Sequence, residues 1–123
     1  IMGYIFANFL GEKFNPQAKT VILNSNLKKF GTLQKGQKAS HFFKIKNVGN
    51  KDLKIVNVST RCHCTVPDWN SNPIPPGAVD SINVVYDTSI LGPFNQSVEI
   101  YTNAENSKET VHVLGIVEDN KEG

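Results

Sequence analysis

Residues 41–48, HFFKIKNV, contain the alternation that decides the fold. In an extended chain, Phe43 and Ile45 fall on one side and Lys44 and Lys46 on the other. Successive side chains of a β-strand point to opposite faces of its sheet, so this pattern is typical of a strand with one buried face. The stretch therefore predicts a half-buried strand that packs on a hydrophobic core.

The same two-residue pattern, or a short β-branched run, recurs on both sides of this stretch. The runs are TVILN (20–24), LKIVNV (53–58), SINVVY (81–86), SVEIYT (97–102) and TVHVLGIV (110–117). Each has the length of a strand, and turn-forming pairs such as Lys35-Gly36 and Gly49-Asn50 separate them. No run after residue 19 keeps the 3.6-residue period of a helix.

About seven short strands within about 100 residues are typical of an immunoglobulin-like sandwich. We therefore expect an all-β fold of two antiparallel sheets, preceded by an apolar segment that is expected to be helical. The residues expected to face the core are Phe43, Ile45, Ile55, Val58, Ile82, Val84, Val98, Ile100, Val111 and Val113.

Composition argues against several classes of function. The 123 residues suit one domain, and the 13 basic residues include a single arginine, Arg61, and no basic run. Arginine is the side chain that binds phosphate and guanine through two parallel bonds, so a nucleic-acid partner is not expected. No pair of carboxylates stands out as an acid and base. We expect no enzymatic activity, no cofactor and no small-molecule substrate.

The chain opens with an apolar segment, IMGYIFANFL, residues 1–10. A membrane-crossing helix needs about 20 apolar residues, so this segment is too short to cross alone. Two interpretations stay open: an amphipathic element packed on the domain, or the end of a membrane anchor. Residues 11–19 are expected to form a polar linker, 20–118 the sandwich and 119–123 a tail.

Residues 59–69, STRCHCTVPDW, hold both cysteines of the chain, Cys62 and Cys64, with His63 between them. Because proline lacks an N–H and restricts the residue before it, we expect strand pairing to stop or bend at Pro67. The stretch is then the tail of one strand running into a loop, with Trp69 closing one end of the sandwich.

Four interpretations of the cysteine pair stay open. A disulfide needs a bent backbone, because residues two apart in a straight strand are about 6.6 Å apart, at the outer limit for this bond. Cys62, Cys64 and His63 are candidate metal ligands, but a closed zinc site needs four ligands, and two thiolates alone suit copper(I) better. A cysteine nucleophile needs a base within reach, and His63 points to the opposite face in a strand. We favour a structural pair, packed together at a strand end.

Several motifs resemble one bacterial family in combination. They are Asn47, Gly49 and Asn50 in one turn, Cys62-x-Cys64-Thr65, Pro76-Gly77, Tyr86-Asp87-Thr88 and the late Gly115. Over residues 27–118 the chain resembles domain of unknown function 1573, whose fold is similar to Hydin-type immunoglobulin domains. Members usually have glycine between the two cysteines, where this chain has His63. The resemblance implies export from the cytoplasm and a binding or structural role, with no catalytic activity.

Two classes of function follow. The first is a non-catalytic exported module, periplasmic or otherwise outside the cytoplasm and tethered to the membrane through residues 1–10. It would bind other envelope or membrane proteins, as an accessory subunit of a membrane complex. The alternative is a small thiol redox or copper-handling protein that works through Cys62 and Cys64.

Overall fold

The computed structural model describes residues 17–23 and 25–119. The apolar segment expected at 1–10, most of the linker expected at 11–19 and the tail after Asp119 lie outside the described residues. The described part contains eight strands: β1 (Thr20–Ile22), β2 (Leu27–Gln34), β3 (Ala39–Asn47), β4 (Ile55–Thr60), β5 (Thr65–Trp69), β6 (Val79–Tyr86), β7 (Gly92–Thr102) and β8 (Lys108–Glu118).

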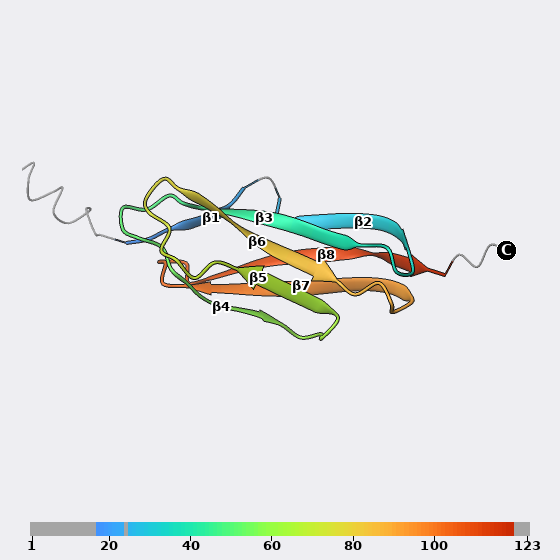
Figure 1. The fold of residues 1–123 in the computed structure, drawn as a ribbon. Coiled ribbons are helices and arrows are strands. Elements are labelled where there is room, and N and C mark those ends of the chain that lie inside the picture. Colours follow the sequence, from blue (N-terminus) through green and yellow to red (C-terminus); the bar gives the residue numbers. More distant parts are fainter. Residues whose placement is uncertain (1–16, 24, 120–123) are drawn as a thin grey trace, which may run out of the picture.

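The strands form two four-stranded sheets that pack face to face (Figure 1). Sheet A has the order β1-β3-β6-β5, and sheet B has the order β2-β8-β7-β4. The first five strands alternate between the two sheets, and β1, β5, β2 and β4 are the edge strands. The expected all-β, immunoglobulin-like sandwich is confirmed.

The core lies between the two sheets and contains all ten residues that the alternation predicted to face inward. Ile45, Ile82, Val84, Val98, Ile100, Val111 and Val113 are fully buried, and Phe43, Ile55 and Val58 are nearly so. Aromatic stacking adds to the contact between sheets, because the rings of Tyr86 on β6 and Phe94 on β7 stack with their centroids 3.7 Å apart. The period of two therefore predicted the buried face of each central strand correctly.

Two features of the strand pairing differ from the expectation. The described part has eight strands instead of about seven, because TVPDW is a separate strand, β5, in the opposite sheet from β4. The sheets are also not wholly antiparallel, since β2 pairs with β8 in parallel. Parallel neighbours require a long connection, and here it is provided by most of the domain between the two strands.

Pro67 does not end the strand pairing, contrary to our expectation, but lies in the middle of β5 opposite Val84. The amide of Asp87 donates to the carbonyl of Cys64 at 2.7 Å, which fixes which residues of β5 face β6. Hydrogen-bonded pairs alternate along antiparallel strands, so the backbone of Pro67 faces away from β6. Its missing N–H is therefore not needed, and proline is tolerated on this edge strand.

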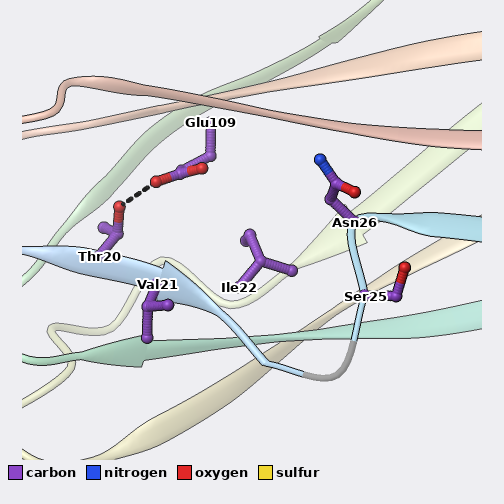
Figure 2. Close-up of a pocket in the computed structure, with 6 residues that line it drawn as sticks. All are labelled: Thr20, Val21, Ile22, Ser25, Asn26 and Glu109. Carbon is purple, nitrogen blue, oxygen red and sulfur yellow. Dashed lines mark hydrogen bonds between the residues drawn. The ribbon is translucent and has the colours of Figure 1, made fainter.

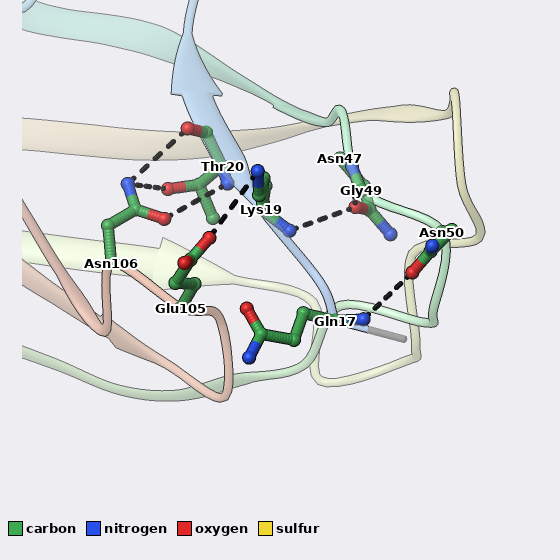
Figure 3. Close-up of polar contacts among 8 residues, drawn as sticks. All are labelled: Gln17, Lys19, Thr20, Asn47, Gly49, Asn50, Glu105 and Asn106. Carbon is green, nitrogen blue, oxygen red and sulfur yellow. Dashed lines mark hydrogen bonds and ion pairs between the residues drawn. The ribbon is translucent and has the colours of Figure 1, made fainter. Parts of the chain in front are cut away.

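The turn after β3 holds the first described residues against the sandwich (Figure 3). The amide of Gln17 donates to Asn50 Oδ1 at 2.8 Å, and the amides of Val48 and Asn50 donate to the carbonyls of Lys19 and Gln17. Position 49 requires glycine, because a Cβ there would overlap the Gln17 carbonyl oxygen and lie 2.6 Å from the Lys19 nitrogen. This set of contacts, which we call the N-terminal clamp, fixes where the chain enters the sandwich.

The two ends of the sandwich differ. The N-terminal clamp lies at the end where β3 finishes, whereas the loop between β4 and β5 lies at the end where β3 starts, since Ala39 and Thr65 both pair with Tyr86. We call the second end the disulfide end. Figure 1 shows the same arrangement, with the described chain starting at one end of the strands and finishing at the other.

Candidate functional site

Cys62 and Cys64 form a disulfide in the loop between β4 and β5. Their Cα atoms are 5.1 Å apart, well inside the usual range for the bond, because the loop bends the chain where a straight strand would hold them at about 6.6 Å. The favoured interpretation, a structural pair close together at a strand end, is correct in position. The prediction left the redox state of the pair open, and in the structure the two sulfurs are bonded.

Backbone hydrogen bonds hold the disulfide loop independently of the sulfur bridge. The amide of Thr65 donates to the carbonyl of Cys62 at 3.2 Å, and the hydroxyl of Thr60 donates to the same carbonyl at 3.2 Å. The amide of Asp87, just after the end of the neighbouring strand β6, donates to the carbonyl of Cys64. The bridge therefore closes a loop of three residues whose ends are already fixed, and such a short loop gives a small entropic stabilisation of about 1.6 kcal/mol.

The two sulfur-bearing residues differ in exposure. Cys64 is 4% exposed and belongs to the hydrophobic core, whereas Cys62 is only partly buried at the rim of that core. The amide of Cys64 donates to Cys62 Sγ at 3.1 Å, and Cys64 Sγ lies 3.7 Å from Thr65 Oγ1. Both flanking residues, Arg61 and His63, are exposed.

The structure does not combine the candidate metal ligands into a metal site. Both thiols are used in the disulfide, and in residues 17–23 and 25–119 no three His, Cys, Asp or Glu side chains come together. His63 is exposed and contributes to the lining of a surface hollow. Because both sulfurs are in the bridge, neither cysteine is a free thiol nucleophile in this structure.

This hollow, which we call the disulfide-end hollow, has a volume of about 480 Å³ and opens beside the loop. It lies between the β2–β3 turn, β5 and the end of β6. Val66 and Val85 are apolar residues of its lining. The polar residues of its lining are Gln37, Lys38, His63, Tyr86, Asp87, Thr88 and Ser89.

Two ionisable groups that line the hollow have shifted pKa values: the pKa of Asp87 is lowered and the pKa of Tyr86 is raised. The backbone amide of Ser89, which donates to Asp87 Oδ1 at 2.9 Å, and the Ser89 hydroxyl lower the pKa of Asp87. Burial, and then the charge of Asp87, raises the pKa of the Tyr86 phenol. Asp87 is therefore charged and Tyr86 protonated at neutral pH, so the lining of the hollow includes a carboxylate next to a neutral phenol.

The outward face of sheet A carries exposed apolar side chains, which the sequence analysis did not single out. Phe42 is 57% exposed and Val66 is 55% exposed, and Val21 and Val79 are also exposed. These residues come from all four strands of the sheet, and Val66 adjoins the disulfide-end hollow. The sequence HFFKIKNV already indicated an exposed apolar residue, because Phe42 lies on the side of the strand that otherwise carries lysines.

A shallow hollow of about 390 Å³ lies on this face around Phe42, Asp68 and Asn83. The three residues are cross-strand neighbours, since Asn83 pairs with Phe42 on one side and Asp68 on the other. Asn83 Oδ1 is buried, and nothing in the described part of the chain donates a hydrogen bond to it. A buried acceptor without a donor is costly, so this oxygen favours a ligand that supplies one.

A third hollow lies at the seam where the chain passes from β1 to β2, and it has a structural explanation (Figure 2). Thr20 Oγ1 donates to Glu109 Oε2 at 2.9 Å, and Asn106 Nδ2 donates to the same carboxylate and to Thr20 Oγ1. These bonds tie β1 to the start of β8 across the two sheets. The polar groups of the seam therefore satisfy one another.

Within the described residues there is no helix that is long and apolar enough to span a bilayer.

The fold places this chain among PapD-like and immunoglobulin-like sandwiches. It is similar to a protein of unknown function from Porphyromonas gingivalis W83, with a TM-score of 0.73 and 18% identity over 82% of this chain and 48% of that one. It is also similar to the ASH/PapD-like domain 7 of human CEP192, with a TM-score of 0.68 and 13% identity over 85% and 89%. The CsuC–CsuE chaperone–tip adhesion subunit complex of Acinetobacter baumannii matches with a TM-score of 0.51 and 14% identity over 82% and 58%.

The chain belongs to the family described as protein of unknown function (DUF1573), whose model matches residues 21–117. The resemblance inferred from the motifs is thereby confirmed. No curated protein matches the sequence. The chain spans about half the length of the Porphyromonas protein, so the activity and partners of that whole protein do not transfer directly.

Proposed function

We propose that this chain is a non-catalytic, exported binding module that acts as an accessory subunit of a protein complex in the bacterial cell envelope. The observation that carries the proposal is the outward face of sheet A, where Phe42, Val66 and Val79 are exposed and where the hollow beside Phe42 contains an unpartnered oxygen, Asn83 Oδ1. Exposed apolar groups that gather on one face, with a few polar groups among them, are typical of a protein-binding surface.

The chemistry of this face suggests what the partner supplies. Apolar side chains of the partner would cover Phe42 and Val66, and an N–H or a cationic group would donate to Asn83 Oδ1 beside the carboxylate of Asp68. Pro67 removes the central outward donor of edge strand β5, which disfavours addition of a partner strand there. Binding through the face of the sheet is therefore favoured over extension of this edge.

The structural neighbours support a binding role for the fold. One of them is a chain of a pre-assembly complex between a chaperone and a tip adhesion subunit, and another is a PapD-like domain. At 13–14% identity they support only the general role of a sandwich that contacts another protein. The partner of this chain is the one that fits the outward face of sheet A, and the structural neighbours do not identify it.

Photo-crosslinking tests the binding face directly. We expect p-benzoylphenylalanine in place of Phe42, in cells that express the whole protein, to form one dominant crosslinked product in the envelope fraction. The matched control replaces Tyr101, an aromatic residue on the outward face of sheet B. Equal crosslinking from the two positions, or none from Phe42, would show that the face of sheet A is not the binding surface.

We further propose that residues 1–10 tether the module to the membrane on the exported side. The apolar composition of this segment, and the export that the family resemblance implies, support the tether. The whole protein should then stay with the membrane through a carbonate wash and require detergent for release. A chain that starts at Gln17, and so keeps the N-terminal clamp, should be released and folded. Recovery of the whole protein in the soluble fraction would contradict the tether.

A further inference from the structure

We propose that the Cys62–Cys64 disulfide exchanges with the thiols of a dithiol protein, with Cys62 as the sulfur that is attacked and Cys64 as the sulfur that leaves. This activity goes beyond the proposed binding function and does not depend on it. The observations that carry it are the placement of the bridge, the unequal exposure of its two residues and the polar groups around them.

The bridge is placed where its opening leaves the fold intact. The carbonyls of Cys62 and Cys64 accept hydrogen bonds from Thr65, Thr60 and Asp87, and none of these bonds involves a sulfur atom. The strands that flank the loop belong to different sheets: β4 pairs with β7 in sheet B, and β5 pairs with β6 in sheet A. A bridge that closes so short a loop is a poor structural staple. Reversible opening is what a thiol-exchange pair requires.

The unequal exposure of the two cysteines decides the direction of attack. An incoming thiolate can reach Cys62, which lies at the rim of the core, but the side chain of Cys64 is buried within it. The amide of Cys64, 3.1 Å from Cys62 Sγ, is a donor for the thiolate that forms on Cys62.

The disulfide-end hollow gives the partner a place beside the loop. Val66 and Val85 offer an apolar surface next to His63, and Asp87 supplies a charged acceptor at the opposite rim. An extended segment around the partner's cysteine can lie there while its sulfur approaches Cys62. The hollow thus explains why a protein thiol, and not only a small one, would be the substrate.

The exchange balances as follows. A partner thiolate attacks Cys62 Sγ, a bond forms between these two sulfurs, the Cys62–Cys64 bond breaks, and Cys64 leaves as a thiolate that takes up a proton. A second thiolate of the partner then attacks the partner's first sulfur, forms the partner disulfide and releases Cys62, which also takes up a proton. Two electrons and two protons pass from the partner dithiol to the pair.

The test uses the purified whole protein and two single variants as a matched pair. Wild-type protein is equilibrated in glutathione redox buffers and then with a reduced synthetic peptide that carries two cysteines, and free thiols are counted by alkylation and mass spectrometry. We expect reversible reduction with the sandwich retained in the circular dichroism spectrum. We also expect one peptide disulfide to form for each pair reduced.

The variants test the direction of attack. Cys64→Ser, which leaves the partly exposed Cys62 thiol, should form a mixed disulfide with oxidised glutathione about tenfold faster or more than Cys62→Ser, which leaves the buried Cys64 thiol. Cys64→Ala replaces Cys64→Ser if the buried hydroxyl destabilises the fold. A bridge that stays closed in all the buffers, a sandwich that unfolds on reduction, or equal reactivity of the two variants would each overturn the proposal.

Discussion

Ile45 shows how much a single residue of the core contributes. Its side chain is fully buried between the sheets, on a strand that has neighbours on both sides. Ile45→Ala removes buried methylene groups and leaves a cavity that the rigid strands cannot fill, so the free energy of unfolding should fall by about 2–5 kcal/mol. Urea denaturation measures the loss. The control is Val79→Ala on the exposed face, which should change the same free energy by at most about 0.5 kcal/mol.

His41 gives the domain a specific response to acid. Burial at the inner face of β3, and then the positive charge of Lys28, lowers the pKa of His41 below its ordinary value of 6.5, and the ring packs edge-on against Phe43. The folded state therefore binds a proton less readily than the unfolded chain. The contribution of neutral His41 to stability is complete above about pH 6.5 and is lost as the pH falls through the lower pKa of the folded state.

NMR titration of the His41 ring checks this prediction. Its midpoint should lie below the ordinary value, and Lys28→Gln should raise it only part of the way, because burial is the larger cause. His41→Gln should remove this part of the pH dependence of unfolding. A midpoint at or above 6.5 would show that His41 is not held neutral by the fold.

The sequence predicted single residues well where one physical rule decided them. The inward residues follow from the two-residue period alone, because a slip of one position would expose the whole set. The bond between Cys62 and Cys64 was undecided, because it depends on a bend that the loop between two different sheets imposes. The exposed Phe42 was missed because the pattern was read for its buried side, and an apolar residue on the other side was not examined.

Among the elements, strand β1 has the fewest residues and depends most on the N-terminal clamp. Asn47 is fully buried and holds the clamp together: its Oδ1 accepts from the amides of Lys19 and Gly49, and its Nδ2 donates to the carbonyls of Lys51 and Ile74. The motif that suggested the family is thus a set of contacts that positions the first strand. The sequence indicated a turn at these residues but not what the turn holds.

Gly49→Ala should release β1 from sheet A. The added Cβ would overlap the backbone of Gln17 and Lys19, and backbone atoms cannot move aside as a flexible side chain can. We expect rapid hydrogen exchange at the amides of Val48 and Asn50, which donate to this segment, together with a loss of stability. Exchange measured by NMR tests it.

Gly77→Ala is the control for the clamp. Gly77 has a φ of 84° and open space around its missing Cβ, so alanine there brings backbone strain of about 1 kcal/mol without a clash. It should lower stability slightly and leave exchange at Val48 and Asn50 slow. If both variants behave alike, the effect of Gly49→Ala is general strain and not release of β1.

The elements that the sequence predicted poorly are those decided by distant partners. Edge strand β2, LKKFGTLQ, has no clean alternation, and it is paired to β8, which lies at the other end of the chain. Strand β5 was expected to be a loop because Pro67 disfavours a ladder, a rule that does not apply to the outward positions of an edge strand. Which strands become edges is decided by the assembled sheets, and the sequence of a single strand does not determine it.

At the scale of the whole molecule, the two ends of the sandwich have separate roles. The N-terminal clamp fixes the point where residues 1–16 join the domain, and the disulfide loop and its hollow lie at the opposite end. The nine residues of β3 run between these ends, a span of about 30 Å. If residues 1–10 are tethered as proposed, residues 11–16 allow a further reach of about 20 Å, and the disulfide end faces away from the membrane.

Energy transfer from two labelled positions measures this orientation in the whole protein. Lys51→Cys places a fluorophore beside the N-terminal clamp, and Lys35→Cys places the same fluorophore at the disulfide end; both replace a lysine, and both leave the native cysteines in their bridge. In vesicles with an acceptor dye on the lipid headgroups, transfer should be clearly more efficient from position 51 than from position 35, because the sandwich separates them by most of its length. A chain that starts at Gln17 should show no transfer from either label. Equal transfer from both positions in the whole protein would mean that the sandwich lies flat on the bilayer, and the disulfide end would then be a membrane-facing surface and not an outward one.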